Sequence, residues 1–343
     1  MKFNLQEMIR PHLVGLKSYQ TLRSSLLDNQ MVLLDANENP FGEYNRYPDG
    51  DPIQLKQKLA EINKVQPENL FLGNGSDELI DLVMRIFCEP TEDSIMVFDP
   101  SFVMYEIYAT MNNLQVEKLK LNADFQLEKA GFLHSISKTK AKILFLCSPN
   151  NPTGNSINDL EFYIKNFTGI VVVDEAYIEF SSEISAVNLL NKYPNLIVFK
   201  TLSKAFGMAG LRVGVGISSV EIARLFSQFK PPYNISSESQ KLALEQLNQL
   251  ENIENNITFI LKEKEKLKIG LEQINTVVKM YPSEANFLLI EFKNADFVFK
   301  ELLDAKILTS LRHPSLKNCI RISVGTAEEN LEVLNVISRL TKS

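Results

Sequence analysis

One lysine, Lys204, stands in a setting that suits covalent chemistry. It follows two hydroxyl residues in the run Thr201–Ala205, and Arg212 comes eight positions after it. A lysine that forms a Schiff base must lose its proton, which nearby positive charge or desolvation promotes. The hydroxyls of Thr201 and Ser203 and the guanidinium of Arg212 suit a phosphate beside that lysine. These residues predict a covalently held aldehyde cofactor with a phosphate tail, pyridoxal 5'-phosphate. An ordinary loop with a solvated lysine is the alternative.

A carboxylate ends an apolar, β-branched run at residues 170–174, which is typical of a buried parallel strand. Ligands of open α/β sheets bind at the carboxyl ends of such strands. Asp174 could therefore pair with the pyridinium nitrogen of the cofactor and keep the ring protonated. Tyr177 could donate to the ring's phenolic oxygen. A helix-capping aspartate is the alternative, but the spacing from Lys204 favours the cofactor role.

Two further loops follow expected strands. Prolines and a glycine restrain the loop at 148–154, so that Asn151 could donate to the same phenolic oxygen. Phe102, after the strand at 94–98, could stack on a flat ring. A structural Asx-turn and core packing are the respective alternatives.

The run at 71–80 predicts a strand, a glycine turn and a helix. The N–H groups of that helix start, with Ser76 as a plausible cap beside Gly75 and Asp77, would form an anion site. The glycines fit neither a Walker loop nor a dinucleotide fingerprint.

Alternating strands and helices predict an α/β fold with a mostly parallel, seven-stranded sheet flanked by helices. The expected strands are 69–73, 94–98, 115–120, 143–147, 169–174, 196–200 and 212–217. A proline-rich break at 230–234 suggests a hinge, followed by a long helical stretch at 236–274. A smaller α+β unit with strands near 286–292 and 319–324 and a helix from about Ala327 completes the chain. We therefore expect an N-terminal arm (1–29), a large cofactor domain (30–235) and a small C-terminal domain (236–343).

Composition narrows the possible functions. The net charge of −6 argues against nucleic acid or an anionic membrane as a partner. No segment is apolar over a membrane-spanning length, and the start has no signal-like core. The three cysteines, Cys88, Cys147 and Cys319, are scattered among apolar residues and predict reduced thiols in a cytoplasmic protein. The three histidines share no metal spacing, so neither zinc nor a Ser-His-Asp site is expected.

The motifs together resemble the histidinol-phosphate aminotransferase family of fold-type I pyridoxal-phosphate enzymes. The resemblance extends from about Tyr19 to beyond Arg321, nearly the whole chain. It is carried by the runs 34–40 (LDANENP), 45–48 (NRYP), 75–78 (GSDE), 148–154 (SPNNPTG), 174–180 (DEAYIEF), 201–206 (TLSKAF) and 320–326 (IRISVGT).

The resemblance implies a role for each matching residue. Lys204 would be the Schiff-base lysine and proton shuttle, with Asp174 at the ring nitrogen. Tyr177 and Asn151 would meet the ring hydroxyl, with Phe102 at the stacking position. The cofactor phosphate would be held by Gly75, Ser76, Asp77, Ser203 and Arg212, and by Tyr47 from the partner subunit of a homodimer. Arg321, Asn151 and Tyr19 would line the substrate pocket.

The chain departs from the family at one position. Members commonly carry an arginine directly after the apolar strand that precedes the final motif, whereas Thr309 and Ser310 stand here and Arg312 comes later. Arg312 either takes over substrate binding or is solvated. This departure bears on the phosphate substrate more than on the reaction type.

The implied reaction is transamination of L-histidinol phosphate with 2-oxoglutarate, in histidine biosynthesis. An aromatic amino-acid aminotransferase or a threonine-phosphate decarboxylase on the same scaffold remains open. A cofactor-binding regulator would need a DNA-binding domain, which we do not expect here. A nicotinamide-dependent dehydrogenase would need glycines that this chain lacks.

Overall fold

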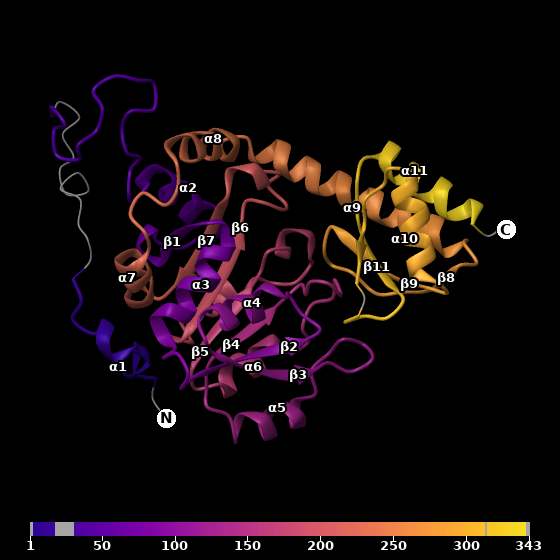
Figure 1. Cartoon of the computed structure of the whole chain (residues 1–343), viewed down its shortest axis with the longest axis horizontal. Coiled ribbons are helices and arrows are strands. Elements are labelled where there is room, and N and C mark those ends of the chain that lie inside the picture. Colours follow the sequence, from indigo (N-terminus) through magenta and orange to yellow (C-terminus); the bar gives the residue numbers. More distant parts are fainter. Residues whose placement is uncertain (1–2, 18–30, 313, 341–343) are drawn as a thin grey trace.

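Two sheets of different size organise the chain (Figure 1). The computed structural model describes residues 3–17, 31–312 and 314–340. The strands of the large sheet are β1 (Leu70–Asn74), β2 (Ser94–Asp99), β3 (Gln115–Lys120), β4 (Ala141–Cys147), β5 (Ile170–Asp174), β6 (Leu196–Thr201) and β7 (Val213–Ser218). Their order is β1-β7-β6-β5-β4-β2-β3, and only the two pairings of β7 are antiparallel. The predicted seven-stranded, mostly parallel sheet is confirmed.

Helices cover both faces of this sheet. In β4, Ile143 and Phe145 join the apolar cluster on one face, and Leu144 and Leu146 join the cluster on the other. The first cluster includes residues of α3 (Gly75–Phe87), α4 (Met104–Met111) and α7 (Val220–Phe229). The second includes residues of α5 (Lys129–Ile136) and α6 (Leu160–Asn166). Burial on both faces explains why central strands such as β4 and β5 are apolar over successive residues rather than alternating.

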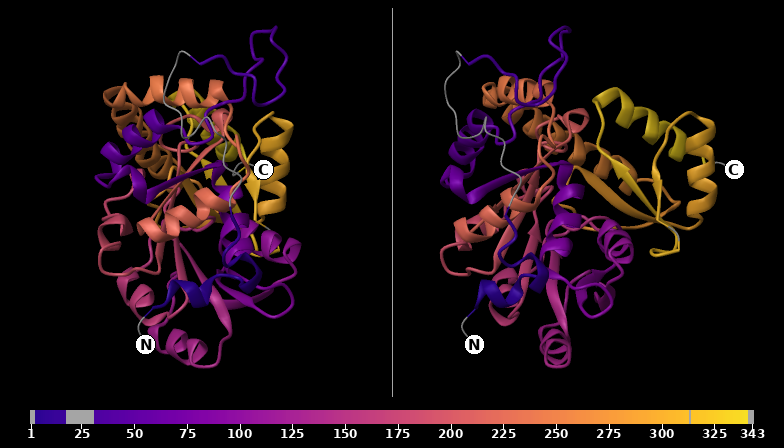
Figure 2. Two further views of the ribbon diagram at one scale, coloured as in Figure 1. Left: turned by 90° about the vertical axis from the view of Figure 1, so that its left-hand side faces the viewer. Right: turned by 60° about the vertical axis from the view of Figure 1, so that its left-hand side comes forward.

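The C-terminal unit is a smaller α+β layer, as predicted, and stands to one side of the large sheet (Figure 2). Its strands are β8 (Val277–Met280), β9 (Phe287–Phe292), β10 (Ser310–Leu311) and β11 (Cys319–Ser323). They pair antiparallel in the order β10-β11-β9-β8. One apolar cluster joins them to α10 (Ala295–Asp304) and α11 (Ala327–Arg339).

The long helical stretch expected at 236–274 is confirmed, and the structure divides it into two helices. These are α8 (Ser237–Leu247) and α9 (Leu250–Glu272), separated by Asn248 and Gln249. Leu247 of α8 packs with the large sheet. α9 begins in the same cluster, at Ile253, and reaches the core of the small sheet at Leu267, so that α9 contacts both units. The domain boundary after residue 235 stays a prediction, although this packing groups α8 with the large sheet.

The N-terminal segment contacts the large sheet through a short helix, α1 (Leu5–Met8), and the buried Ile9. Residues 31–52 form no helix or strand and are mostly exposed. Tyr19 lies outside the described residues. Among the helices described, none combines the length and apolarity needed to cross a membrane.

Candidate active site

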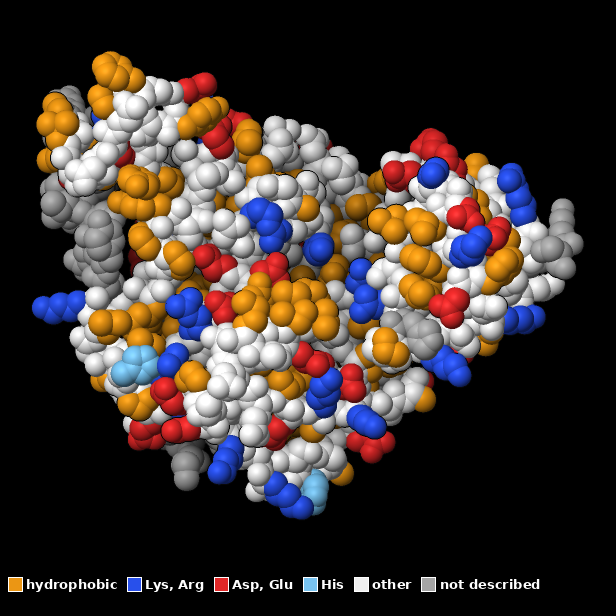
Figure 3. Space-filling view, viewed as in Figure 1, with side chains coloured by type: hydrophobic (Ala, Val, Ile, Leu, Met, Phe, Trp, Pro, Cys, Tyr) orange, Lys and Arg blue, Asp and Glu red, His pale blue; other side chains and the backbone are white. Residues whose placement is uncertain are grey.

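A pocket of about 310 Å³ lies where the carboxyl ends of the large sheet's parallel strands face the small sheet. The space-filling view shows a hollow between the two units (Figure 3). The start of α3, directly after β1, and the loops that follow β2, β4, β5 and β6 all contribute to its lining. The predicted residues in it are Ser76, Asp77, Phe102, Asn151, Asp174, Tyr177, Ser203, Lys204, Arg212, Arg312 and Arg321. Residues far apart in the sequence thus meet where α/β sheets bind ligands.

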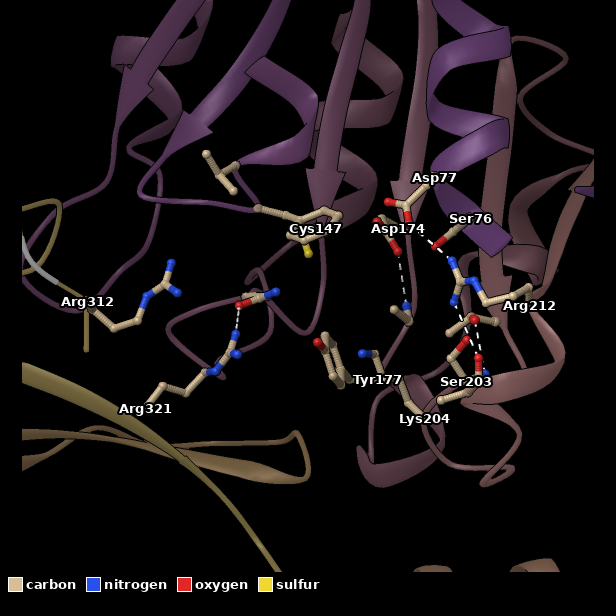
Figure 4. A pocket seen from close by; sticks show the side chains of 16 residues that line it. Ser76, Asp77, Cys147, Asp174, Tyr177, Ser203, Lys204, Arg212, Arg312 and Arg321 are labelled. Carbon is tan, nitrogen blue, oxygen red and sulfur yellow. Dashed lines mark hydrogen bonds and ion pairs between the residues drawn. The ribbon is translucent and has the colours of Figure 1, made fainter. Parts of the chain in front are cut away.

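Lys204 points into the pocket beside Tyr177 (Figure 4). Its Nζ lies 5.8 Å from the centroid of the Tyr177 ring. Burial of the amine lowers the pKa of Lys204, and the guanidinium of Arg321 lowers it further. Both effects favour the neutral amine, which is the nucleophilic form.

Asp174 is a buried carboxylate at the last position of β5. The Tyr105 hydroxyl donates to Oδ2 at 2.7 Å, and the Ala176 N–H donates to Oδ1 at 3.2 Å. Burial raises the pKa of Asp174, while these two hydrogen bonds oppose the rise. A cationic partner in the pocket would compensate the desolvation of this carboxylate.

The start of α3 lies at the pocket, where the anion site is expected, although one detail of the prediction is wrong. Asn74, rather than Ser76, occupies the N-cap position, and it makes no side-chain cap. The reason is that β1 continues into the helix through Gly75, whose φ of +74° turns the chain within one residue. Ser76 is therefore inside the first turn and lines the pocket. Arg212 faces it and pairs with Asp77 at 3.3 Å.

Gly214 allows β7 to lie directly against the start of α3. A Cβ atom at this position would lie 2.4 Å from the carbonyl carbon of Gly75 and 2.5 Å from the amide nitrogen of Ser76. The absence of a side chain lets β7 pass against the start of α3. The Arg212 carbonyl can then accept a hydrogen bond from the Gly75 N–H at 2.8 Å. Arg212 and the helix start are thereby fixed to one another.

Asn151 connects the two sheets. Its Oδ1 accepts a hydrogen bond from Nη1 of Arg321, which leaves its amide nitrogen able to donate to a ligand. The Arg321 guanidinium lies over the Phe287 ring, 5.2 Å from the centroid. Phe287 also makes a T-shaped contact with Tyr177, with the ring centroids 5.2 Å apart. This packing holds Arg321 at the pocket wall, opposite Arg212.

Arg312 lines the same pocket, on the side of Arg321. Its Nη1 donates to the Ser310 hydroxyl at 3.1 Å, and its Nε is buried without a hydrogen-bond partner. Burial, and then Arg321, lowers the pKa of Arg312. Two neighbouring guanidiniums, one with an unused donor, provide a site for an anion.

Two predicted residues lie elsewhere. Gly75 is at the turn behind the pocket rather than in its lining. Tyr47 is 52% exposed and stacks on Tyr233 with centroids 4.7 Å apart, away from this pocket. Its expected role concerns a partner subunit and stays a prediction.

A family model described as aminotransferase class I and II matches residues 11–337. The chain belongs to this aminotransferase family. The histidinol-phosphate aminotransferase of Christiangramia forsetii is 42% identical to it over 345 residues, which covers 98% of each chain. The resemblance predicted from the motifs is confirmed.

Solved structures agree on the fold. The histidinol-phosphate aminotransferase from Clostridium acetobutylicum superposes with a TM-score of 0.79 at 24% identity, covering 87% of this chain and 91% of that one. The Sinorhizobium meliloti histidinol-phosphate aminotransferase, solved in complex with pyridoxal 5'-phosphate, has a TM-score of 0.79 at 22% identity. The coverage there is 88% of this chain and 84% of that one. At these identities the likeness supports the aminotransferase fold alone.

Sequence reasoning missed several residues of this aminotransferase pocket. Those in the lining are Val103, Cys147, Ala176 and Ala209. Cys147 is the last residue of β4, so the strand-end argument used for Asp174 could have found it. Tyr105 was missed because an apolar stripe of α4 conceals its hydroxyl, and only the fold reveals its bond to Asp174.

Proposed function

We propose that this aminotransferase converts L-histidinol phosphate and 2-oxoglutarate to imidazole-acetol phosphate and glutamate, with pyridoxal 5'-phosphate as cofactor, in histidine biosynthesis. One observation carries the proposal: a single pocket joins an amine of lowered pKa, a buried carboxylate and an anion site to two arginines opposite. The names of relatives about 40% identical over nearly the whole chain support the same substrate.

The pocket residues suit this cofactor. The tight passage of Gly214 past Gly75 places Arg212 beside the start of α3, and a helix start together with a guanidinium suits a phosphate. The buried carboxylate of Asp174 suits a protonated ring nitrogen, because that charge would offset its desolvation. We assign the phosphate to Ser76, Asp77, Ser203 and Arg212, and the ring face to Phe102. When bound, pyridoxal phosphate supplies an electron sink for the substrate's α-carbon.

The remaining roles follow from position. Lys204 holds the cofactor and moves the proton at the substrate's α-carbon, which its lowered pKa favours. Tyr177 and Asn151 donate to the ring hydroxyl oxygen. Arg321 and Arg312 bind the anionic end of each substrate, since a guanidinium fork fits both phosphate and carboxylate.

Absorption spectroscopy during titration with L-histidinol phosphate, without an oxo acid, tests this function. We expect the visible band of the lysine-bound cofactor to be replaced by the near-ultraviolet band of the aminated cofactor. A band that stays unchanged would contradict the substrate and direct the search to aromatic amino acids and threonine phosphate. A protein without any such band would contradict the cofactor.

We further propose a cytoplasmic homodimer with shared sites. The exposed apolar side chains of the segment that includes Tyr47 support this, among them Val32, Leu34 and Phe41, each more than 80% exposed. Tyr47→Phe should then weaken cofactor retention, measured by dialysis. A fully active monomer in sedimentation would contradict the shared sites.

A further inference from the structure

The turn between β8 and β9 connects the small sheet to the large one. The Glu284 N–H donates to the Gly154 carbonyl at 2.7 Å. Its Oε2 accepts hydrogen bonds from the hydroxyls of Ser156, at 3.1 Å, and Ser181. One carboxylate of the small sheet therefore binds two separate loops of the large sheet.

The first of these loops carries Asn151. It is closed by hydrogen bonds from the Gly154 N–H to the Asn150 carbonyl at 2.7 Å and from the Asn150 N–H to the Asn155 carbonyl at 2.8 Å. The loop therefore moves as one body. If the loop shifted at its contacts with Glu284, the Asn151 amide would be displaced with it.

The second loop carries Tyr177. The Phe180 N–H donates to the Tyr177 carbonyl, and the Ser181 N–H donates to the Ile178 carbonyl, both at 3.0 Å. This tight turn joins Ser181 to Tyr177. Glu284 thus acts on the two side chains assigned to the ring hydroxyl.

A buried lysine of α9 fixes the backbone around Glu284. Lys264 Nζ donates to the carbonyls of Ser283 and Ala285, at 2.9 and 3.0 Å. Ala285 is fully buried in one cluster with Tyr177. The residues on both sides of Glu284 are therefore immobilised, so its carboxylate has a defined direction.

We propose that Glu284, held by Lys264, is a positioning residue that sets Asn151 and Tyr177 relative to Arg321. We call its contacts with Ser156 and Ser181 the Glu284 latch. Together with the bond from Arg321 to Asn151, the latch links the substrate-binding sheet to the ring-binding loops. The contacts of Glu284 do not depend on the function proposed above, whereas their effect on catalysis rests on it.

Hydrogen exchange of the full-length protein tests the latch without reference to activity. Glu284→Ala should speed amide exchange in both loops, residues 148–156 and 174–181. Glu284→Gln should preserve most of the protection, because an amide oxygen can still accept from both serines. Glu291→Ala is the matched control, since this β9 carboxylate accepts from Tyr281 within its own sheet. Unchanged exchange in either loop of Glu284→Ala would overturn the latch.

The cofactor's visible band tests the positioning role. Hydrogen bonds to the deprotonated ring oxygen lower its pKa, so misplaced donors should raise the pH midpoint at which the band titrates. Glu284→Ala should raise this midpoint and reduce kcat/KM by about 10- to 100-fold, since small misplacements have effects of that order. Glu284→Gln should largely restore both values. An unmoved midpoint in Glu284→Ala would refute the positioning role.

A second variant and the exchange measurement distinguish a failure of the latch from a failure of the proposed function. If Glu284→Ala does not fold, the double variant Ser156→Ala/Ser181→Ala removes the same bonds from the other side and should give the same changes. If the unmodified protein has no visible band, the proposed function is wrong, and the exchange measurement still decides whether the latch exists.

Discussion

The two walls of the pocket are built differently. On the large-sheet wall, Asp174 ends β5 and Lys204 comes three residues after β6, so both are placed by strand ladders. On the small-sheet wall, Arg321 lies within β11 and Arg312 follows the two-residue strand β10. Side-chain bonds such as that from Arg321 to Asn151 hold the second wall against the first.

This difference in construction implies that the two walls have different functions. A wall that belongs to the large sheet itself can hold a cofactor rigidly, whereas a wall that belongs to a second sheet and contacts the first through a few hydrogen bonds can move when a substrate binds. Changes on the large-sheet wall should therefore abolish chemistry, and changes on the small-sheet wall should alter substrate binding. Substitutions on each wall test whether the two walls have these different functions.

Lys204→Ala should have the largest effect. Removal of the amine eliminates both the covalent hold on the cofactor and the proton transfer, so turnover should fall by at least about 10³-fold. Steady-state assays and the loss of the visible band measure this. Lys279→Ala, which changes an exposed lysine of β8, should have no effect. Normal transamination by Lys204→Ala would refute the assigned chemistry.

Asp174→Asn should retain the cofactor but slow the proton-transfer step by about 10²- to 10³-fold, the usual effect of losing one preorganised electrostatic partner. Single-turnover kinetics measures this step. Tyr105→Phe should have a smaller effect. Tyr105→Phe removes a hydrogen bond that favours the ionised carboxylate, so it should raise the pKa of Asp174. The acidic limb of the pH–rate profile should then shift to higher pH. An unchanged rate in Asp174→Asn would mean that the ring-nitrogen partner is wrongly assigned.

The contrast between the two walls also explains which features can be predicted from the sequence. Most strands of the large sheet are apolar runs bounded by turn residues, so they and the polar residues at their carboxyl ends, such as Asp174, are evident from local pattern. Lys204 and Asn151 are predicted for the same reason. Their meeting in one pocket also follows, because parallel strands present their carboxyl ends together.

Contacts between the units could not be predicted, because they depend on how two sheets pack. Nothing near Glu284 in the sequence indicates that it reaches Ser156 and Ser181, more than a hundred residues away. The division of residues 236–274 into two helices was also not evident, since neither a glycine nor a proline stands at the break, Asn248 and Gln249. Ser76 was misassigned as a cap because the direct passage from β1 into α3 is a tertiary feature.

Arg312→Gln tests the small-sheet wall and should have a moderate effect. We expect KM for L-histidinol phosphate to rise about tenfold, since a hydrogen bond to a charged group contributes about 1.5–3 kcal/mol. KM for 2-oxoglutarate should rise less, because a phosphate ester carries more charge than a carboxylate. Arg321→Gln serves as the comparison and should raise both values. Equal changes for both substrates in Arg312→Gln would contradict a preference for phosphate.

Gly214→Ala tests whether the large-sheet wall is as rigid as its geometry indicates, and its effect should be the smallest. The added Cβ would meet backbone atoms of Gly75 and Ser76, which cannot rotate away as a side chain can. Such overpacking typically lowers the free energy of unfolding by about 1–3 kcal/mol. Urea denaturation measures this, with Gly131→Ala in α5 as the control. At Gly131 the added atom meets open space, so a helical alanine should instead stabilise the protein by about 0.5–1 kcal/mol. Equal stability of Gly214→Ala and the parent protein would show that β7 can shift away from α3, and the contrast between a rigid and a movable wall would then be lost.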